Sequence, residues 1–192
     1  MSAPVVQDFR RRLLDGLAAS IEERGYREST VADIVRCART SKRTFYDHFA
    51  GKEECFIELV SAKNDDLVVT LTEAVDPEAP WQQQVRQAVT AYVGTIEASP
   101  AIALSWIRDL PALGDAARPT VRRGFSQLSA VLVALSGTPG FLRAGLQPMS
   151  PAAALILVGG LRELTAQTVE DGGPVAEMIE PAVAAATALV VG

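Results

Sequence analysis

The chain has 192 residues, 48% of them hydrophobic and 21% charged, a balance that excludes disorder along the whole chain. Its length suits one large domain or a small domain joined to a larger one. The formal net charge is −5, but residues 1–54 hold 10 of the 18 basic and only 9 of the 23 acidic residues. The acidic excess therefore belongs to the second part of the chain, and the total charge does not exclude a nucleic-acid partner for the first part.

The cysteines and the apolar segments indicate the compartment. Cys37 and Cys55 stand far apart without a Cys-x-x-Cys spacing, which favours reduced cytosolic thiols over a disulfide framework or a zinc site. The first twelve residues contain no apolar stretch of the signal-peptide type. The most apolar runs, residues 151–161 and 182–191, are far shorter than the ~20 residues of a membrane span. We therefore expect a cytoplasmic protein with no membrane segment, whose apolar runs are buried helices.

An apolar stripe predicts the first helix, from about residue 7 to residue 24. Its members recur four residues apart, at Phe9, Leu13, Leu17 and Ile21. A glycine C-cap is expected directly after the last turn, at Gly25.

Two short helices are predicted next. Thr30 is expected to cap the second helix, and Ser41 caps a third one only a few residues later. Phe45 and Phe49 are four residues apart and point into a core, whereas the other faces of the third helix carry Lys42, Arg43, Tyr46 and Asp47. Two short helices joined by a tight turn form a helix-turn-helix pattern, which places the second helix of the pair in the major groove of DNA.

Helical signals continue to the end of the chain. Further helices are expected over about residues 52–74, 81–98, 115–135 and 150–170, with a short helix ending at Leu110 and a last helix containing Pro181. Loops are expected at residues 76–80, 137–140 and 172–174. No segment shows the alternation of a strand, so the predicted fold class is all-α.

Residues 29–56 carry a specific resemblance. Their sequence, S-T-V-A-D-I-V-R-C-A-R-T-S-K-R-T-F-Y-D-H-F-A-G-K-E-E-C-F, resembles the DNA-binding signature of the TetR family of repressors. The similarity is strongest in T-F-Y-D-H-F followed by G-K-E, and it covers roughly residues 7–60. The remainder resembles the family in length and helical character. Departures fall at Arg39 and Thr40, where the family usually has glycine and a small apolar residue, and at Arg43, which is often glycine.

The resemblance implies a set of DNA-binding residues. Lys42 and Arg43 would reach base edges or nearby phosphates, and Tyr46 would hydrogen-bond a phosphate, as would His48. The other members would hold phosphates, or a thymine methyl group in one case, and the complete set is Thr30, Ser41, Lys42, Arg43, Thr44, Tyr46, His48 and Lys52.

Structural alternatives exist for several of these residues. Arg43 and Asp47 have the i, i+4 spacing of a solvated ion pair. His48, the only histidine, could serve as a buried capping residue. Cys37 and Cys55 are interpreted as packing residues.

The resemblance also implies the overall organisation: a three-helix DNA-binding domain over residues 1–51 and a helical bundle over residues 52–192 for ligand capture and dimerisation. The predicted ligand contacts lie on the middle helices, at Tyr92, Leu104, Trp106, Phe125 and Leu128, with Arg108, Asp109 and Arg122 as polar anchors or surface charges. The apolar residues of the last two long helices form either a dimer face or an internal core, and they are Leu155, Ile156, Val158, Leu161, Ile179, Val183 and Val190.

These observations favour one function over two others. We expect a homodimeric repressor that binds a pseudo-palindromic double-stranded operator and is released by a small apolar or amphipathic ligand. An enzyme is disfavoured because Gly-x-Ser-x-Gly, P-loop and Gly-x-Gly-x-x-Gly motifs are missing, and we expect no metal or other cofactor. A helical adaptor would not need the basic face of the third helix. Activation instead of repression is compatible with the same features.

Overall fold

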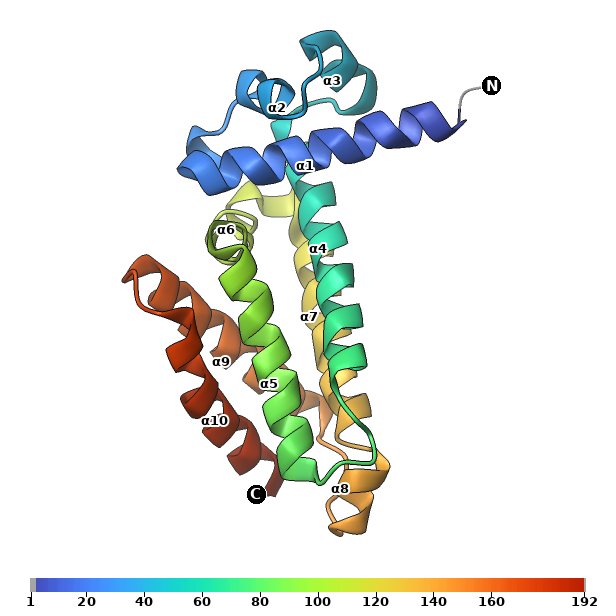
Figure 1. Cartoon of the computed structure of the whole chain (residues 1–192), viewed down its shortest axis with the longest axis vertical. Coiled ribbons are helices and arrows are strands. Elements are labelled where there is room, and N and C mark those ends of the chain that lie inside the picture. Colours follow the sequence, from blue (N-terminus) through green and yellow to red (C-terminus); the bar gives the residue numbers. More distant parts are fainter. Residues whose placement is uncertain (1–2, 192) are drawn as a thin grey trace. The chain divides into compact units, whose positions relative to one another are not determined.

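The computed structural model describes residues 3–191, and within them it contains helices and no strand (Figure 1). The all-α prediction is therefore confirmed for this range. The helices are α1 (Ala3–Glu28), α2 (Val31–Cys37), α3 (Lys42–His48), α4 (Lys52–Ala74), α5 (Trp81–Ala98), α6 (Pro100–Arg108), α7 (Arg118–Leu135), α8 (Pro139–Arg143), α9 (Pro151–Glu170) and α10 (Ile179–Val191), with short 3-10 helices η1 (Pro111–Ala116) and η2 (Val175–Met178).

The first compact unit comprises residues 1–63 and 100–120. Its centre is the predicted stripe of α1, because Leu13, Leu17 and Ile21 are fully buried. The regular part of α1 ends at Gly25, which has a φ of 80°. Glycine adopts this conformation without strain, whereas residues with a Cβ atom are strained in it. The predicted C-cap glycine therefore lies where the helix breaks.

Helix α6 belongs to this first unit although it is distant in sequence. The Glu22 carboxylate accepts the N–H of Ile102 at 3.3 Å, and the Arg27 guanidinium pairs with Asp109 at 2.8 Å. Packing therefore divides the chain differently from the predicted boundary at residues 51 and 52: the first half of α4 and all of α6 join the helix-turn-helix segment.

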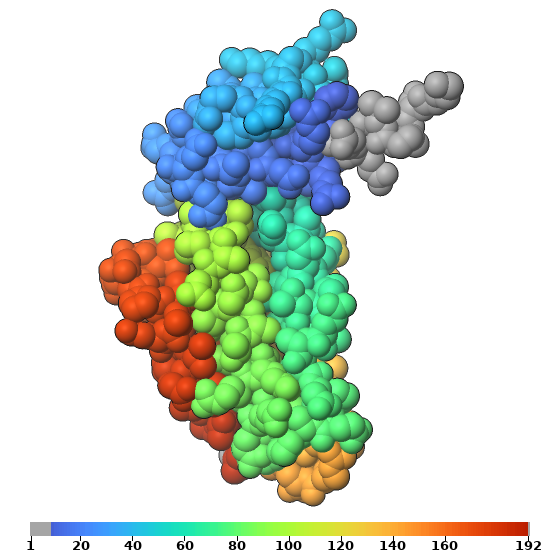
Figure 2. Space-filling view, in the orientation of Figure 1, coloured from blue at the N-terminus to red at the C-terminus, as the bar shows by residue number. Residues whose placement is uncertain are grey.

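The second compact unit comprises residues 64–99 and 121–192. It contains the rest of α4 with α5 and α7–α10, and its cores combine residues of α5, α9 and α10. On the face seen in Figure 2, α5 lies between α10 and the C-terminal part of α4. Residues 139–143, part of which was expected to be loop, form the short helix α8.

Helix α9 is, among residues 3–191, the one helix long and apolar enough to cross a membrane by length and composition. Such a helix is also typical of the core of a helical bundle. One face of α9 packs inward through Ala154, Leu157 and Val158. The opposite face leaves Leu155 and Ile156 exposed, so the expected burial of this apolar run is only partial within one chain.

Candidate functional site

Local capping fixes both helices of the helix-turn-helix. The Thr30 hydroxyl oxygen accepts the N–H of Asp33 at 3.3 Å, and the Asp33 carboxylate accepts the N–H of Thr30 at 3.1 Å. The hydrogen bond from the Thr30 hydroxyl to this carboxylate is the main reason that the pKa of Asp33 is lowered. At the next helix, the Ser41 hydroxyl accepts the N–H of Thr44 at 3.1 Å. Both predicted N-caps are therefore confirmed.

The turn between the helices has an unusual backbone. Arg39 has a φ of 50°, the only positive φ of a non-glycine residue in the described chain. The Arg12 guanidinium donates to the carbonyl oxygens of Ala38 and Arg39 at 2.7 and 2.9 Å. A side chain from α1 thus closes the end of α2 and holds the turn in place.

Helix α3 has a buried side and an exposed polar side. Phe45 is fully buried, whereas Lys42 and Arg43 are exposed and Tyr46 has 59% of its surface exposed. Within residues 9–191 no ion pair joins Arg43 to Asp47. The arrangement leaves two cations and a phenol on a rigid, capped helix, where they are available to a partner.

The remaining predicted DNA contacts differ in accessibility. Ser41 and Thr30 are exposed, but their hydroxyl groups serve as helix caps. Thr44 and His48 are half-buried. The backbone carbonyl of His48 accepts a hydrogen bond from Arg10 at 2.9 Å, so this residue also contributes to the packing of α3.

Lys52 occupies a different environment from the predicted phosphate contact. Its ammonium lies 3.0, 3.3 and 2.9 Å from the carbonyl oxygens of Tyr26, Arg27 and Ser29. It also lies 4.4 Å from the centroid of the Tyr26 ring, and burial lowers its pKa. Because an ammonium has three protons, these carbonyls occupy all of its donors. Lys52 therefore closes the C-terminal end of α1.

Arg10 and Gly16 of α1 support the site and were not identified from the sequence. The Arg10 guanidinium donates to Glu58 and lies 4.4 Å from the centroid of the Phe49 ring. Gly16 faces α2 so closely that a Cβ atom there would lie 2.6 Å from the carbonyl oxygen of Ile34. The run of three arginines at residues 10–12 was the sequence feature that could have indicated the supporting role of Arg10. A glycine inside an otherwise regular helix was the feature that could have indicated the close approach of α1 and α2 at Gly16.

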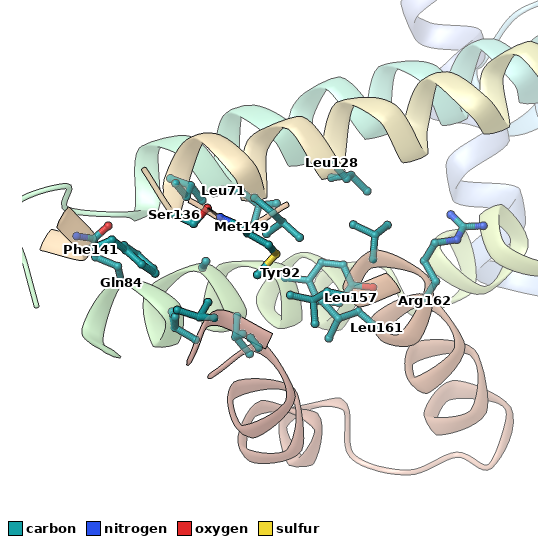
Figure 3. Close-up of a pocket in the computed structure, with 18 residues that line it drawn as sticks. Leu71, Gln84, Tyr92, Leu128, Ser136, Phe141, Met149, Leu157, Leu161 and Arg162 are labelled. Atoms are coloured by element: carbon teal, nitrogen blue, oxygen red, sulfur yellow. Dashed lines mark hydrogen bonds between the residues drawn. The ribbon is translucent and has the colours of Figure 1, made fainter. Parts of the chain in front are cut away.

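The second unit contains an elongated cavity with a free volume of about 80 Å³. All but four of the eighteen described residues that line it are apolar, among them Leu71, Leu128, Met149 and Leu157. The four polar ones are Gln84, Tyr92, Ser136 and Arg162. Figure 3 shows Arg162 at one end of the cavity and Gln84 with Phe141 at the other.

The five predicted ligand contacts are not brought together. Tyr92 and Leu128 line the cavity. Phe125 does not line it, although its ring lies under the guanidinium of the lining residue Arg162, 4.7 Å from the guanidinium carbon to the ring centroid. Leu104 and Trp106 belong to α6, in the other compact unit. The end of α5 before Ser99–Pro100 agrees with the predicted helix boundaries, but the helical pattern alone did not show that α6 belongs to the first unit. The described residues also contain no group of three His, Cys, Asp or Glu side chains placed to hold a metal ion.

The seven predicted dimer residues divide into two groups. Leu155 and Ile156 are 50% and 66% exposed. The other five are buried or half-buried within the second unit, and they are Val158, Leu161, Ile179, Val183 and Val190. The exposed pair lies on one side of α9, because the helical period turns Leu157 and Val158 inward.

A capped recognition helix with an exposed basic face, held on a three-helix core, defines a helix-turn-helix protein of the DNA-binding class. Residues 13–59 match the family model described as bacterial regulatory proteins, tetR family. The HTH-type transcriptional repressor DhaR of Mycobacterium sp. (strain GP1) is 27% identical over 119 residues, which cover 62% of this chain and 60% of DhaR. The repressor KstR2 of Mycobacterium tuberculosis is 39% identical over 92 residues, covering 48% of this chain and 46% of KstR2.

A solved structure extends the similarity in fold to nearly the whole chain. FadR from Bacillus subtilis, in complex with stearoyl-CoA, superposes with a TM-score of 0.75 and 17% identity, covering 94% of this chain and 97% of FadR. Residues 13–59 therefore carry a DNA-binding segment similar to that of the tetR family of bacterial regulatory proteins, and the likeness to FadR shows the fold of the remainder. The match spans about half the length of the curated relatives.

Proposed function

We propose that the protein is a homodimeric repressor that binds a pseudo-palindromic operator and dissociates from it when a small amphipathic ligand binds. The observation that carries this proposal is the capped helix α3, which exposes Lys42, Arg43 and Tyr46 on one side and buries Phe45 on the other. The curated relatives DhaR and KstR2 are named as repressors. Such a protein acts in the cytoplasm, where its operator is.

The proposed DNA contacts follow the accessibility of each side chain. Lys42 and Arg43 read base edges or hold phosphates, and Tyr46 donates to a phosphate. The family resemblance implies two further sets of contacts to the sugar-phosphate backbone of the DNA. Thr44 and His48 reach it through their exposed parts, and the capping residues Thr30 and Ser41 approach it at the helix N-termini. Lys52 is left out of this set because its three donors are already used.

Helix α4 supports a route from ligand to DNA. It begins at Lys52, which holds the end of α1, and it reaches Leu71, which lines the cavity. Between these points the Asn64 side chain donates to Gln127 of α7 at 2.8 Å, and Asp65 accepts from Arg123 at 3.0 Å. We propose that ligand binding shifts the population of α4 positions. Only a difference in ligand affinity between two states can produce such a shift.

Selection of bound sequences from a random duplex library, at a stated salt concentration, tests the proposal. We expect wild-type protein to enrich a pseudo-palindrome, because a two-fold dimer presents two recognition helices. Arg43→Ala is expected to weaken operator binding by about 1–3 kcal/mol and to relax the preference at one position of each half-site. Tyr46→Phe is expected to weaken binding more uniformly across sequences.

Arg143→Ala, which removes an exposed arginine of the second unit, is the matched control and is expected to leave binding unchanged. A folded wild-type protein that enriches no sequence at low or moderate salt would contradict the repressor assignment and favour the adaptor alternative.

A further inference from the structure

The cavity in the second unit combines an apolar wall with a single charged group. Among the eighteen described residues that line it, Arg162 is the only one with a formal charge at neutral pH. An apolar wall selects an apolar ligand body, and a few polar groups set its orientation. The position of the polar groups therefore indicates how a ligand lies in the cavity.

The end of the cavity at Gln84 has no donor to offer. The Gln84 amide donates to the carbonyl oxygens of Pro77 and Ala79 at 3.0 and 2.9 Å, while its own oxygen accepts from Thr138. Ser136 nearby donates to a backbone carbonyl and accepts the N–H of Met149 at 2.7 Å. Because these groups are satisfied within the protein, this end suits the apolar terminus of a ligand.

The opposite end suits an anion. The Arg162 guanidinium lies over the Phe125 ring, with 4.7 Å between its central carbon and the ring centroid, and burial lowers the pKa of Arg162. As the one formal charge among the described lining residues, Arg162 is the group with which an anionic end of a ligand can pair. The Tyr92 hydroxyl is 2.9 Å from the Thr165 hydroxyl, which itself donates to Leu161. Tyr92 is therefore the donor to Thr165 and has no further proton to give to a ligand.

The size of the cavity limits the length of the ligand. A bound water needs roughly 10–15 Å³ of such free volume, so about 80 Å³ corresponds to roughly five to eight water-sized units. A methylene group is similar in size to a water molecule. The apolar part of the ligand is therefore much shorter than an eighteen-carbon stearoyl chain.

We propose that this cavity binds a medium-chain carboxylate of about five to eight carbons, with its carboxylate paired to Arg162 and its chain directed towards Gln84. The role of this ligand as the effector rests on the proposed function, but its binding does not. A guanidinium can hold both oxygens of a carboxylate at once, which distinguishes this end group from an alcohol or an ammonium.

Isothermal titration of the full chain with octanoate tests the assignment. Octanol and octylammonium serve as neutral and cationic analogues of the same length, and stearate serves as a long acid. We expect octanoate to bind at least tenfold more tightly than each of the three, because octanol and octylammonium cannot pair with Arg162 as an anion does and stearate exceeds the cavity.

Two variants and a control connect binding to the cavity. Arg162→Gln is expected to reduce octanoate affinity by about tenfold to a hundredfold, with little effect on octanol. Ala88→Leu adds three carbons to a lining residue and is expected to abolish binding of both. Arg143→Gln removes an exposed charge of α8 that does not line the cavity and is expected to leave affinity unchanged. Thermal unfolding followed by circular dichroism establishes that each variant is folded.

Three results would overturn the assignment: octanol binding as tightly as octanoate, equal affinities for octanoate and stearate, or a folded Arg162→Gln protein with wild-type octanoate affinity. Operator binding by the same preparations is measured separately. Operator binding without octanoate binding rejects the ligand class and leaves the proposed function standing. Octanoate binding by a protein that enriches no DNA sequence supports the ligand class and rejects the proposed function.

Discussion

Arg39 shows how a single residue can be retained at a cost in stability. Its φ of 50° lies in the left-handed region, where a side chain is disfavoured by about 1 kcal/mol relative to glycine. We therefore predict that Arg39→Gly raises the free energy of unfolding by up to about 1 kcal/mol. Urea denaturation followed by circular dichroism measures this change. The increase is partly offset because glycine also gives the unfolded chain more freedom.

Arg39→Ala is the matched control, since it removes the charge and keeps a Cβ atom in the strained conformation. It is expected to leave stability near that of wild type. If the alanine variant is stabilised as much as the glycine variant, backbone strain is not the cause. Operator affinity of both variants then shows whether the Arg39 charge contributes to DNA binding, as its exposed position in the turn allows.

Residue roles that depend on neighbouring residues could be predicted from the sequence. The caps Thr30 and Ser41 bond to residues three positions away, so their function is encoded locally. Lys52 could not be interpreted in this way, because its carbonyl partners lie 23 to 26 residues earlier in the chain. The order of residues in the motif gave no indication of which way the Lys52 side chain turns.

At the level of helices, the crossing of α1 and α2 depends on Gly16. A Cβ atom at this position would lie 2.6 Å from the carbonyl oxygen of Ile34 and 2.8 Å from the Cβ atom of Ala38. Because these are rigid parts of α2, the two helices would have to move apart. We predict that Gly16→Ala destabilises the protein by about 1–3 kcal/mol and weakens operator binding, as measured by urea denaturation and DNA titration.

Gly94→Ala in α5 is the control for helix propensity, because a Cβ atom there meets nothing within 4 Å. This variant is expected to be neutral or stabilised by up to about 1 kcal/mol. Equal stabilisation by both substitutions would show that α1 and α2 have room for the methyl group, in contradiction to the close crossing.

The positions of helices along the chain were predictable, but their partners were not. Apolar spacing and breaks at proline and glycine indicated most of the helices, and Pro181 proved to lie in the first turn of α10. The packing of α6 with α1 depends on contacts such as Arg27 to Asp109, which are 82 residues apart. Periodicity shows which face of a helix is apolar, but not which helix covers it.

For the whole molecule, the exposed apolar face of α9 is the feature that one chain leaves unexplained. Leu155 and Ile156 are followed on this face by Gly159 and Gly160, which permit close approach of a second helix. The outer side of α10 adds small residues, Ala184, Ala185 and Ala188. The sequence left a dimer face and an internal core as alternatives for these residues, and it could not separate exposed residues from inward ones such as Val158.

Ile156→Glu tests the proposed dimer, because it places a charge on the most exposed of the predicted dimer residues, 66% exposed in the single chain. A carboxylate buried between two subunits without a partner carries a large desolvation cost. The dissociation constant of the dimer is therefore expected to rise at least tenfold, which corresponds to a loss of at least about 1.4 kcal/mol of association free energy. Sedimentation velocity over a concentration series measures it. Val69→Glu, at a 51% exposed valine of α4, is the control and should remain dimeric.

Because a monomer engages only one half-site, Ile156→Glu should also lose operator affinity. A dimer of unchanged stability in Ile156→Glu would place the interface elsewhere.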